Sequence, residues 1–111
     1  MTWTVDASGT QTATIGVEEV LVADDTNNGT YAPRVRLTTM QIGDVTEFRI
    51  YTLTLSTDTT LEQVWKRTIG PVPPINDILD FPAIASDVAI KYTLLQVAGT
   101  GRTYRWTLRR I

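Results

Sequence analysis

The residues that could take part in chemistry are few, and most of them are carboxylates and arginines. The chain has 111 residues and contains neither cysteine nor histidine, which removes thiol nucleophiles, disulfides and the usual zinc ligands. Acid–base catalysis would depend on carboxylates or lysines, but the acids lie mostly in segments typical of turns and surfaces. Glu18 and Glu19 are adjacent, so on a strand they project to opposite faces and do not form a pair. We therefore predict no enzymatic activity, no catalytic residue and no cofactor.

The acidic segment at residues 24–29, DDTNNG, matches part of a calcium-binding loop. It lacks the required spacing and the closing glutamate of such a loop. The pair Asn28 and Gly29 is instead a strong hairpin signal, because both residues tolerate positive φ. We predict a turn here, and no metal site. The match of residues 28–30 to a glycosylation acceptor is accidental, because the N-terminus lacks the features of a signal peptide.

The formal charge is only −2, but the two ends of the chain carry opposite charges. Residues 1–33 hold five acids and no base, whereas residues 102–110 hold four arginines and no acid. Forked guanidinium groups match carboxylates, so we predict a protein interface at both ends of the chain. Its expected residues are Trp3, Glu18, Glu19, Arg102, Arg105, Arg109 and Arg110. The alternative is that these charges protect edge strands from aggregation.

Other binding partners are less consistent with the residue pattern. Tyr104 and Trp106 lie near the arginines and could stack on bases, but they alternate with polar residues, as core residues of a strand do. Because the chain is also mildly acidic, we predict no nucleic-acid partner. No apolar run approaches the length of a membrane span, so we predict no membrane partner. Trp3 and Trp65 could stack on a sugar, although packing in the core is the ordinary role of tryptophan.

The composition favours β-structure, with twenty threonines and many other β-branched and aromatic residues. A turn at residues 7–9 should separate the first two short strands, and a second turn, Gly-Thr-Gly at 99–101, should close a C-terminal hairpin. Pro33 cannot donate a backbone hydrogen bond, which indicates that the strand over residues 31–38 begins here or runs along an edge. The expected strands cover residues 2–5, 10–15, 17–23, 31–38, 45–55, 61–69 and 87–98, and a last strand runs from the Gly-Thr-Gly turn to the end of the chain.

Two irregular features are also expected. The hydrophobic phase slips near Ile50 and Tyr51, which predicts a bulge, or alternatively a strand buried on both faces. Residues 70–82 contain four prolines and should form a long loop with one helical turn around residues 76–79. About eight short strands with regular turn signals predict a single domain over residues 1–111, an antiparallel β-sandwich of jelly-roll type. A small closed barrel is the alternative.

Three segments resemble a group of small structural proteins of tailed bacteriophages. They are TWTVDASGTQTATIGVEEVL at residues 2–21, GDVTEFRIYTLTLS at 43–56 and YTLLQVAGTGRTYRW at 92–106. The resemblance covers nearly the whole chain apart from residues 69–86. It implies a virion component assembled in the host cytoplasm, and we expect a decoration or cement protein on the outer head surface. The partners would be the major capsid protein and further copies of this chain, as a dimer or trimer.

Two alternatives remain open for the function. The protein could belong to the neck or tail of the virion, where a few copies would form a ring. It could also be a surface module that binds a host glycan, with Trp65 as the first candidate for stacking on a sugar. The resemblance brings no functional residues to this chain.

Overall fold

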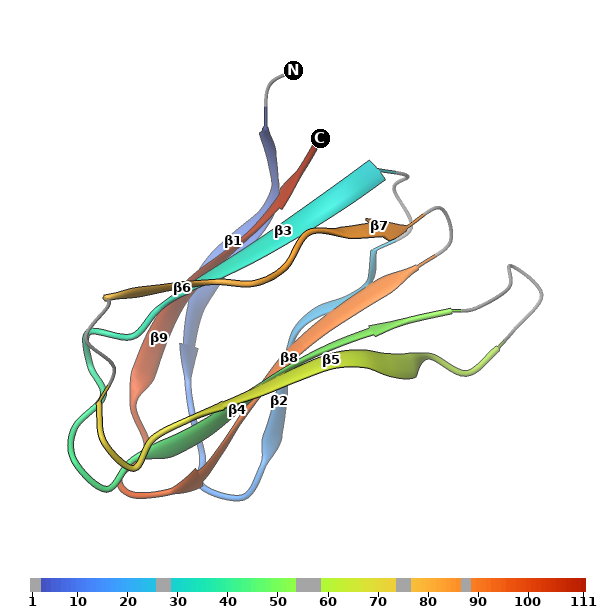
Figure 1. Ribbon diagram of the computed structural model, residues 1–111. Coiled ribbons are helices and arrows are strands. Elements are labelled where there is room, and N and C mark those ends of the chain that lie inside the picture. The colour runs from blue at the N-terminus through green and yellow to red at the C-terminus, as the bar shows by residue number, and fades with distance from the viewer. Residues whose placement is uncertain (1–2, 26–28, 54–58, 74–76, 87–88) are drawn as a thin grey trace.

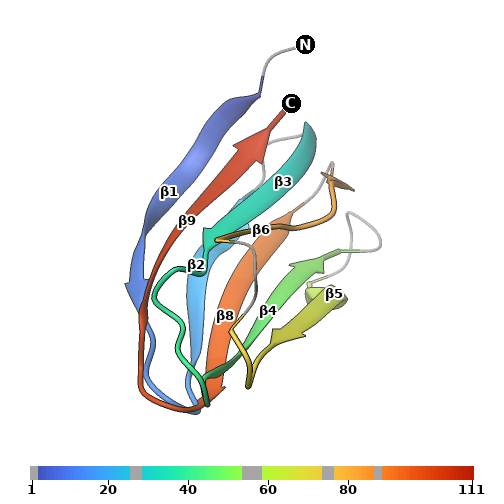
Figure 2. The same cartoon turned by 60° about the vertical axis from the view of Figure 1, so that its left-hand side comes forward.

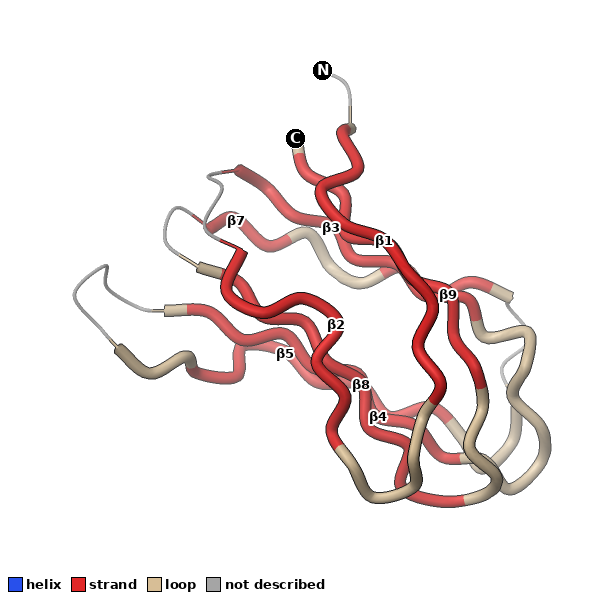
Figure 3. Tube along the Cα trace, turned by 180° about the vertical axis from the view of Figure 1, so that it is seen from behind, coloured by secondary structure: helices blue, strands red, loops and turns tan. Residues whose placement is uncertain are grey.

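Two antiparallel β-sheets pack face to face in the computed structural model (Figure 1). The structure describes residues 3–25, 29–53, 59–73, 77–86 and 89–111. Every regular element within these ranges is a strand. The rear view separates the two layers and shows loops joining them at one end (Figure 3).

Each sheet has four main strands. Sheet A has the order β1 (Thr4–Thr12), β9 (Thr103–Arg110), β3 (Gly29–Arg36) and β6 (Ile78–Asp80), and β7 (Ile84–Ser86) also pairs with β3. Sheet B has the order β2 (Glu18–Asp25), β8 (Ile90–Ala98), β4 (Val45–Thr52) and β5 (Glu62–Ile69). Figure 2 shows the four main strands of sheet A side by side.

The strand pairing is that of a jelly roll. The chain forms a long double ribbon folded at β4 and β5, with β3 next to β6, β2 next to β8, and β1 next to β9. These pairs alternate between the two sheets. The predicted antiparallel sandwich of jelly-roll type is therefore confirmed, and the alternative of a closed barrel is wrong, because neither sheet closes.

The core lies between the sheets and is rich in aromatic residues. Tyr31, Tyr92 and Tyr104 are fully buried. Phe81 has three aromatic neighbours, with ring centroids 4.6 Å away in Trp65, 5.1 Å in Tyr92 and 5.5 Å in Phe48. Alternation along β9 places Tyr104 in this core, with Trp106 packed partly buried against it. The prediction that these two residues are core residues is confirmed.

Both predicted hairpins are wrong. β8 and β9 are consecutive, but they lie in different sheets, and so do β2 and β3. A glycine-containing turn specifies a reversal of the chain, and the reversed strand can either pair with its predecessor or pass to the facing sheet. Here each strand has a buried face, and crossing to the opposite sheet brings two such faces together. Asn28 of the first expected hairpin lies outside the described residues.

Two other local predictions also fail. The expected turn at residues 7–9 is continuous β1, and the irregularity is a register shift between Val5 and Ala7 against β9. The expected helical turn around residues 76–79 is replaced at Ile78 and Leu79 by β6, because these residues pair with Arg36 and Val35. Asn76 lies outside the described residues.

Pro33 of β3 lies opposite the break between the short strands β7 and β6. Pro33 lies within β3, which is an interior strand, so the prediction that the strand begins here or runs along an edge is wrong. On the side away from β9, β7 pairs with β3 up to Tyr31, and β6 pairs with it from Arg34. The carbonyl of Pro33 accepts a hydrogen bond of 3.0 Å from the backbone N–H of Phe81. The missing N–H of proline therefore faces the interval between β7 and β6, where no ladder bond is lost.

The bulge expected in the longest run is confirmed. The pairing of β4 with β5 shifts register between Ile50 and Tyr51. Ile50 is fully buried, whereas Tyr51 lies half-buried on the outer face of sheet B. The shift of hydrophobic phase in the sequence corresponds to this irregularity.

We expect Phe81→Ala to lower the free energy of unfolding by about 3–5 kcal/mol, because it leaves a cavity among three aromatic rings. The change should also weaken β6, which has only three residues and is joined directly to Phe81. Urea unfolding measures the loss. Ile42→Ala is the control, since Ile42 is 85% exposed and should change stability by less than about 0.5 kcal/mol. Equal effects of the two changes would contradict this account of the core.

Candidate protein-interaction face

The two predicted acidic interface residues form contacts within the molecule. The Glu18 carboxylate accepts hydrogen bonds of 2.7 Å from the hydroxyls of Tyr51 and Thr93, and it lies 3.4 Å from Arg49. Burial alone would raise the pKa of Glu18, but these hydrogen bonds and the charge of Arg49 outweigh burial and lower the pKa. Glu19 accepts a hydrogen bond of 3.3 Å from the backbone N–H of Thr14. Both residues thus stabilise β2 and the turn before it.

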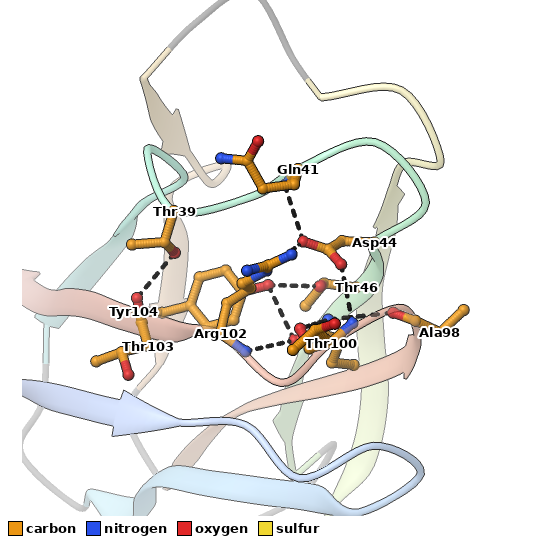
Figure 4. A network of polar contacts seen from close by, with 10 residues as sticks. Thr39, Gln41, Asp44, Thr46, Ala98, Thr100, Arg102, Thr103 and Tyr104 are labelled. Atoms are coloured by element: carbon orange, nitrogen blue, oxygen red, sulfur yellow. Dashed lines mark hydrogen bonds and ion pairs between the residues drawn. The ribbon is translucent and has the colours of Figure 1, made fainter.

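Arg102 is part of a polar network at the end of the sandwich where the loop before β4 meets the loop between β8 and β9 (Figure 4). Its Nε donates to the Asp44 carboxylate at 2.7 Å, and Asp44 is 1% exposed. The same carboxylate accepts hydrogen bonds from the backbone N–H groups of Gln41 at 2.8 Å and Thr100 at 3.1 Å. Asp44 thereby joins the loop before β4 to the loop between β8 and β9.

The loop between β8 and β9 fits closely around this carboxylate. Gly99 has φ of +92°, and a Cβ at this position would collide with the side chain of Asp44. Gln96 completes the network, because its amide donates to the carbonyl of Thr100 at 2.7 Å and its oxygen accepts from the N–H of Arg102 at 3.0 Å. The role of Arg102 in the structure is to hold this crossover between the sheets.

The N-terminal segment and the last strand contact each other through charged side chains. Arg110 forms an ion pair of 3.0 Å with Asp6, whose side chain is 7% exposed. Arg109 lies over the ring of Trp3 at 5.3 Å and forms an ion pair of 3.5 Å with Asp80. One acid of the N-terminal third is therefore paired with an arginine of the last strand, and Trp3 remains 41% exposed beside Arg109.

The outer face of sheet A carries a concentration of arginines. Alternation turns Arg34 and Arg36 of β3 away from the buried Tyr31 and Val35, and it turns Arg105 and Arg109 of β9 away from the buried Tyr104 and Leu108. Because β3 and β9 are neighbours, these four arginines share one surface. Asp80 is the one acid at the outward positions of β3, β6 and β9. We call this surface the arginine face.

One pair of these arginines already binds a carboxylate. Arg34 donates to the two oxygens of Asp80 at 2.5 and 3.0 Å, and Arg109 reaches the same carboxylate at 3.5 Å. Hydrogen bonds from Arg34 lower the pKa of Asp80, and the charges of both arginines lower it further against the opposing effect of burial. Asp80 is thus held ionised between two guanidinium groups.

The other pair, Arg36 and Arg105, forms no ion pair or side-chain hydrogen bond with any described residue. Both side chains line a hollow of about 340 Å³, together with Ser8, Thr10, Arg34, Ile78 and Thr107 among others. Both also line a neighbouring hollow of about 240 Å³ with Thr38, Thr39 and Thr103. The hydroxyl oxygen of Thr107 is buried and has no hydrogen-bond partner among the described residues. This open pair is the candidate binding site.

Of the predicted interface residues, the structure brings Arg105 and Arg109 to the outer face of sheet A, with Trp3 against Arg109. Arg110 is also in β9, but its side chain pairs with Asp6. Glu18 and Glu19 lie in sheet B, and Arg102 lies in the loop before β9. Sequence reasoning missed Arg34, Arg36 and Asp80. The alternation that turns Arg34 and Arg36 outward is visible in the sequence, but their place beside Arg105 depends on the pairing of β3 with β9. Within the described ranges no cluster of three potential metal ligands occurs. No described helix is long and apolar enough to cross a membrane.

Comparisons with protein-family models, with curated proteins and with solved structures found no match to this chain. The candidate site therefore depends on the geometry of the arginine face alone.

We expect Asp44→Asn to lower the free energy of unfolding by about 1.5–3 kcal/mol at neutral pH, because charge-assisted hydrogen bonds are lost at a buried site. Burial raises the pKa of Asp44, but the hydrogen bonds from Arg102, Gln41 and Thr100 outweigh it and lower the pKa overall. The stabilisation is therefore present above the pKa of an unfolded aspartate, about 3.9. It is lost as the pH falls through the lower pKa of the folded state. Urea unfolding across this pH range measures both effects.

The matched control is Asp80→Asn. Asp80 has a lowered pKa as well, but its side chain is 57% exposed, so the change should cost less than about 1 kcal/mol. If Asp44→Asn unfolds with the same midpoint and the same pH dependence as the wild type, Asp44 does not hold the crossover.

Proposed function

We propose that this protein is a structural component of a tailed-bacteriophage virion, a decoration or cement protein that docks on the outer head surface through its arginine face. The observation that carries the proposal is the open pair of Arg36 and Arg105, two arginines on interior strands that form no ion pair with a carboxylate of the described residues. The resemblance of the sequence to small phage structural proteins supplies the biological setting. The expected partner is an acidic surface of the major capsid protein.

The distribution of charge supports docking by this face. Four arginines and Asp80 give the arginine face a formal charge of +3, whereas the whole chain carries −2, so the rest of the chain carries −5. Complementary charge steers association and fixes the orientation of docking. A chain polarised in this way would approach a negatively charged lattice with sheet A first.

The jelly-roll scaffold also suits this role. β3 and β9 are interior strands of sheet A, so the backbone that carries the arginines is held on both sides. A rigid surface loses little conformational entropy on binding. Many copies joined to neighbouring capsid subunits would reinforce a shell even if each contact is weak, because each link raises the effective concentration of the next.

Docking in the neck or tail would use the same surface and differ in copy number. Quantitative mass spectrometry of purified virions from the source phage separates these locations. A ratio near one copy per major capsid protein, or a simple fraction of it, indicates a lattice-covering protein. A dozen copies or fewer indicates the neck or tail, and absence from the virion would contradict the proposal.

Glycan binding has less support from the geometry. Trp65, the expected sugar platform, is half-buried and lies against Phe81 with a ring separation of 4.6 Å. The indole of Trp3 is covered in part by Arg109. We therefore do not include a glycan in the proposal.

We expect Arg105→Glu to weaken binding to capsids by about tenfold or more, because it places a like charge against an acidic partner. Binding of the wild type should also weaken as salt is added. The measurement is co-sedimentation with capsids that lack the protein. Arg67→Glu is the matched control, since Arg67 is exposed on β5 of the other sheet. Equal losses for the two variants would mean that net charge, and not the arginine face, governs docking.

A further inference from the structure

Two arginines of the arginine face bind a carboxylate of the same molecule, that of Asp80. Asp80 of β6 lies between Arg34 of β3 and Arg109 of β9, and it accepts two short hydrogen bonds from the first and one longer bond from the second. Forked guanidinium groups bind carboxylates in this way because two N–H groups can point at two oxygens. The arrangement spans three neighbouring strands.

The open pair lies next to this site on the same strands. Val35 pairs with Trp106, so in an antiparallel ladder the next residues, Arg36 and Arg105, face each other across β3 and β9. On the β6 side, Arg34 pairs with Asp80, whereas Arg36 pairs with Ile78. The position that supplies a carboxylate to Arg34 therefore presents an apolar side chain to Arg36.

The surroundings of the open pair are suited to a polar ligand. The two hollows that meet at Arg36 and Arg105 have volumes of about 340 and 240 Å³. Ser8, Thr10 and Thr107 are among the residues that line the larger one and give its wall a polar character. Ile78, 47% exposed, forms an apolar border. An extended segment with an acidic side chain would find both charge and hydrogen-bonding groups here.

We propose that Arg36 and Arg105 form a binding site for an aspartate or glutamate side chain of a partner protein, which would lie beside Arg36 as Asp80 lies beside Arg34. The ligand is a carboxylate in an acidic segment, because that is the group this face binds at its other arginine pair. This inference rests on the proposed function, since it specifies which chemical group of the acidic partner the arginine face recognises.

The register offers a direct test with Ile78→Asp. This change puts a carboxylate beside Arg36 at the position equivalent to Asp80 beside Arg34, so the protein would fill its own site. We expect the variant to fold, to be at least as stable as the wild type, and to bind an acidic peptide about tenfold more weakly or worse. Ile78→Asn is the matched control, because it has nearly the same shape without the charge, and it should retain binding within about twofold.

The probe is a glutamate-rich peptide, titrated at low ionic strength and followed by calorimetry. Arg36→Gln and Arg105→Gln should each reduce its affinity, whereas Arg67→Gln should not. Inorganic phosphate and a single-stranded DNA oligonucleotide are titrated in parallel. Preferential binding of the peptide, lost in Ile78→Asp and kept in Ile78→Asn, supports the site.

Several outcomes would overturn it. The peptide could fail to bind the wild type, or bind Ile78→Asp as tightly as the wild type. Stronger binding of phosphate or DNA at the same residues would assign the site to a phosphate group instead. If Ile78→Asp still docks on capsids and Arg105→Glu does not, the carboxylate site is wrong while the docking function stands. If both variants bind the peptide poorly but dock normally, the site exists and the docking proposal fails.

Discussion

The buried carboxylate of Asp44 links the two loops in which the chain passes between the sheets before β4 and after β8. It accepts hydrogen bonds from the loop before β4 and from the loop after β8, and Arg102 supplies the compensating charge. A buried ion requires such partners, because its desolvation is otherwise strongly unfavourable. This interaction holds the crossover from β8 to β9, where the chain enters sheet A beside β3. The surface with four arginines exists only because β9 pairs there.

That surface combines two kinds of arginine. Arg34 and Arg109 are already engaged by Asp80, and Arg109 also covers Trp3, so they contribute to the integrity of sheet A. Arg36 and Arg105 lie on the same two strands, but Arg36 pairs with Ile78 of β6 where Arg34 pairs with an acid. The residue that β6 places opposite each arginine therefore decides whether that arginine has a carboxylate partner: Asp80 supplies one to Arg34, and Ile78 supplies none to Arg36. The difference is local, whereas the scaffold is common to both.

Much of the fold follows from patterns in the sequence, and the candidate site does not. Period-two alternation correctly assigns Tyr104 to the core and Arg105 to the surface, and the slip in phase at Ile50 marks a true bulge. Short sequence motifs do not predict which strands pair with each other. Gly-Thr-Gly reverses the chain without choosing between a hairpin and a crossover, and nothing local links Arg34 to Asp80, 46 residues away. The grouping of the arginines is a consequence of strand order, which the sequence does not encode in any short segment.

The break opposite Pro33 has a consequence for how crowded copies of the protein behave. One border of sheet A consists of two three-residue strands, β7 and β6, with the proline facing the interval between them. A continuous row of free N–H and C=O groups is what lets one sheet add to another and start an aggregate. Here the row is interrupted beside the arginines themselves. The protein can therefore display this surface at high local density while that border resists uncontrolled strand addition.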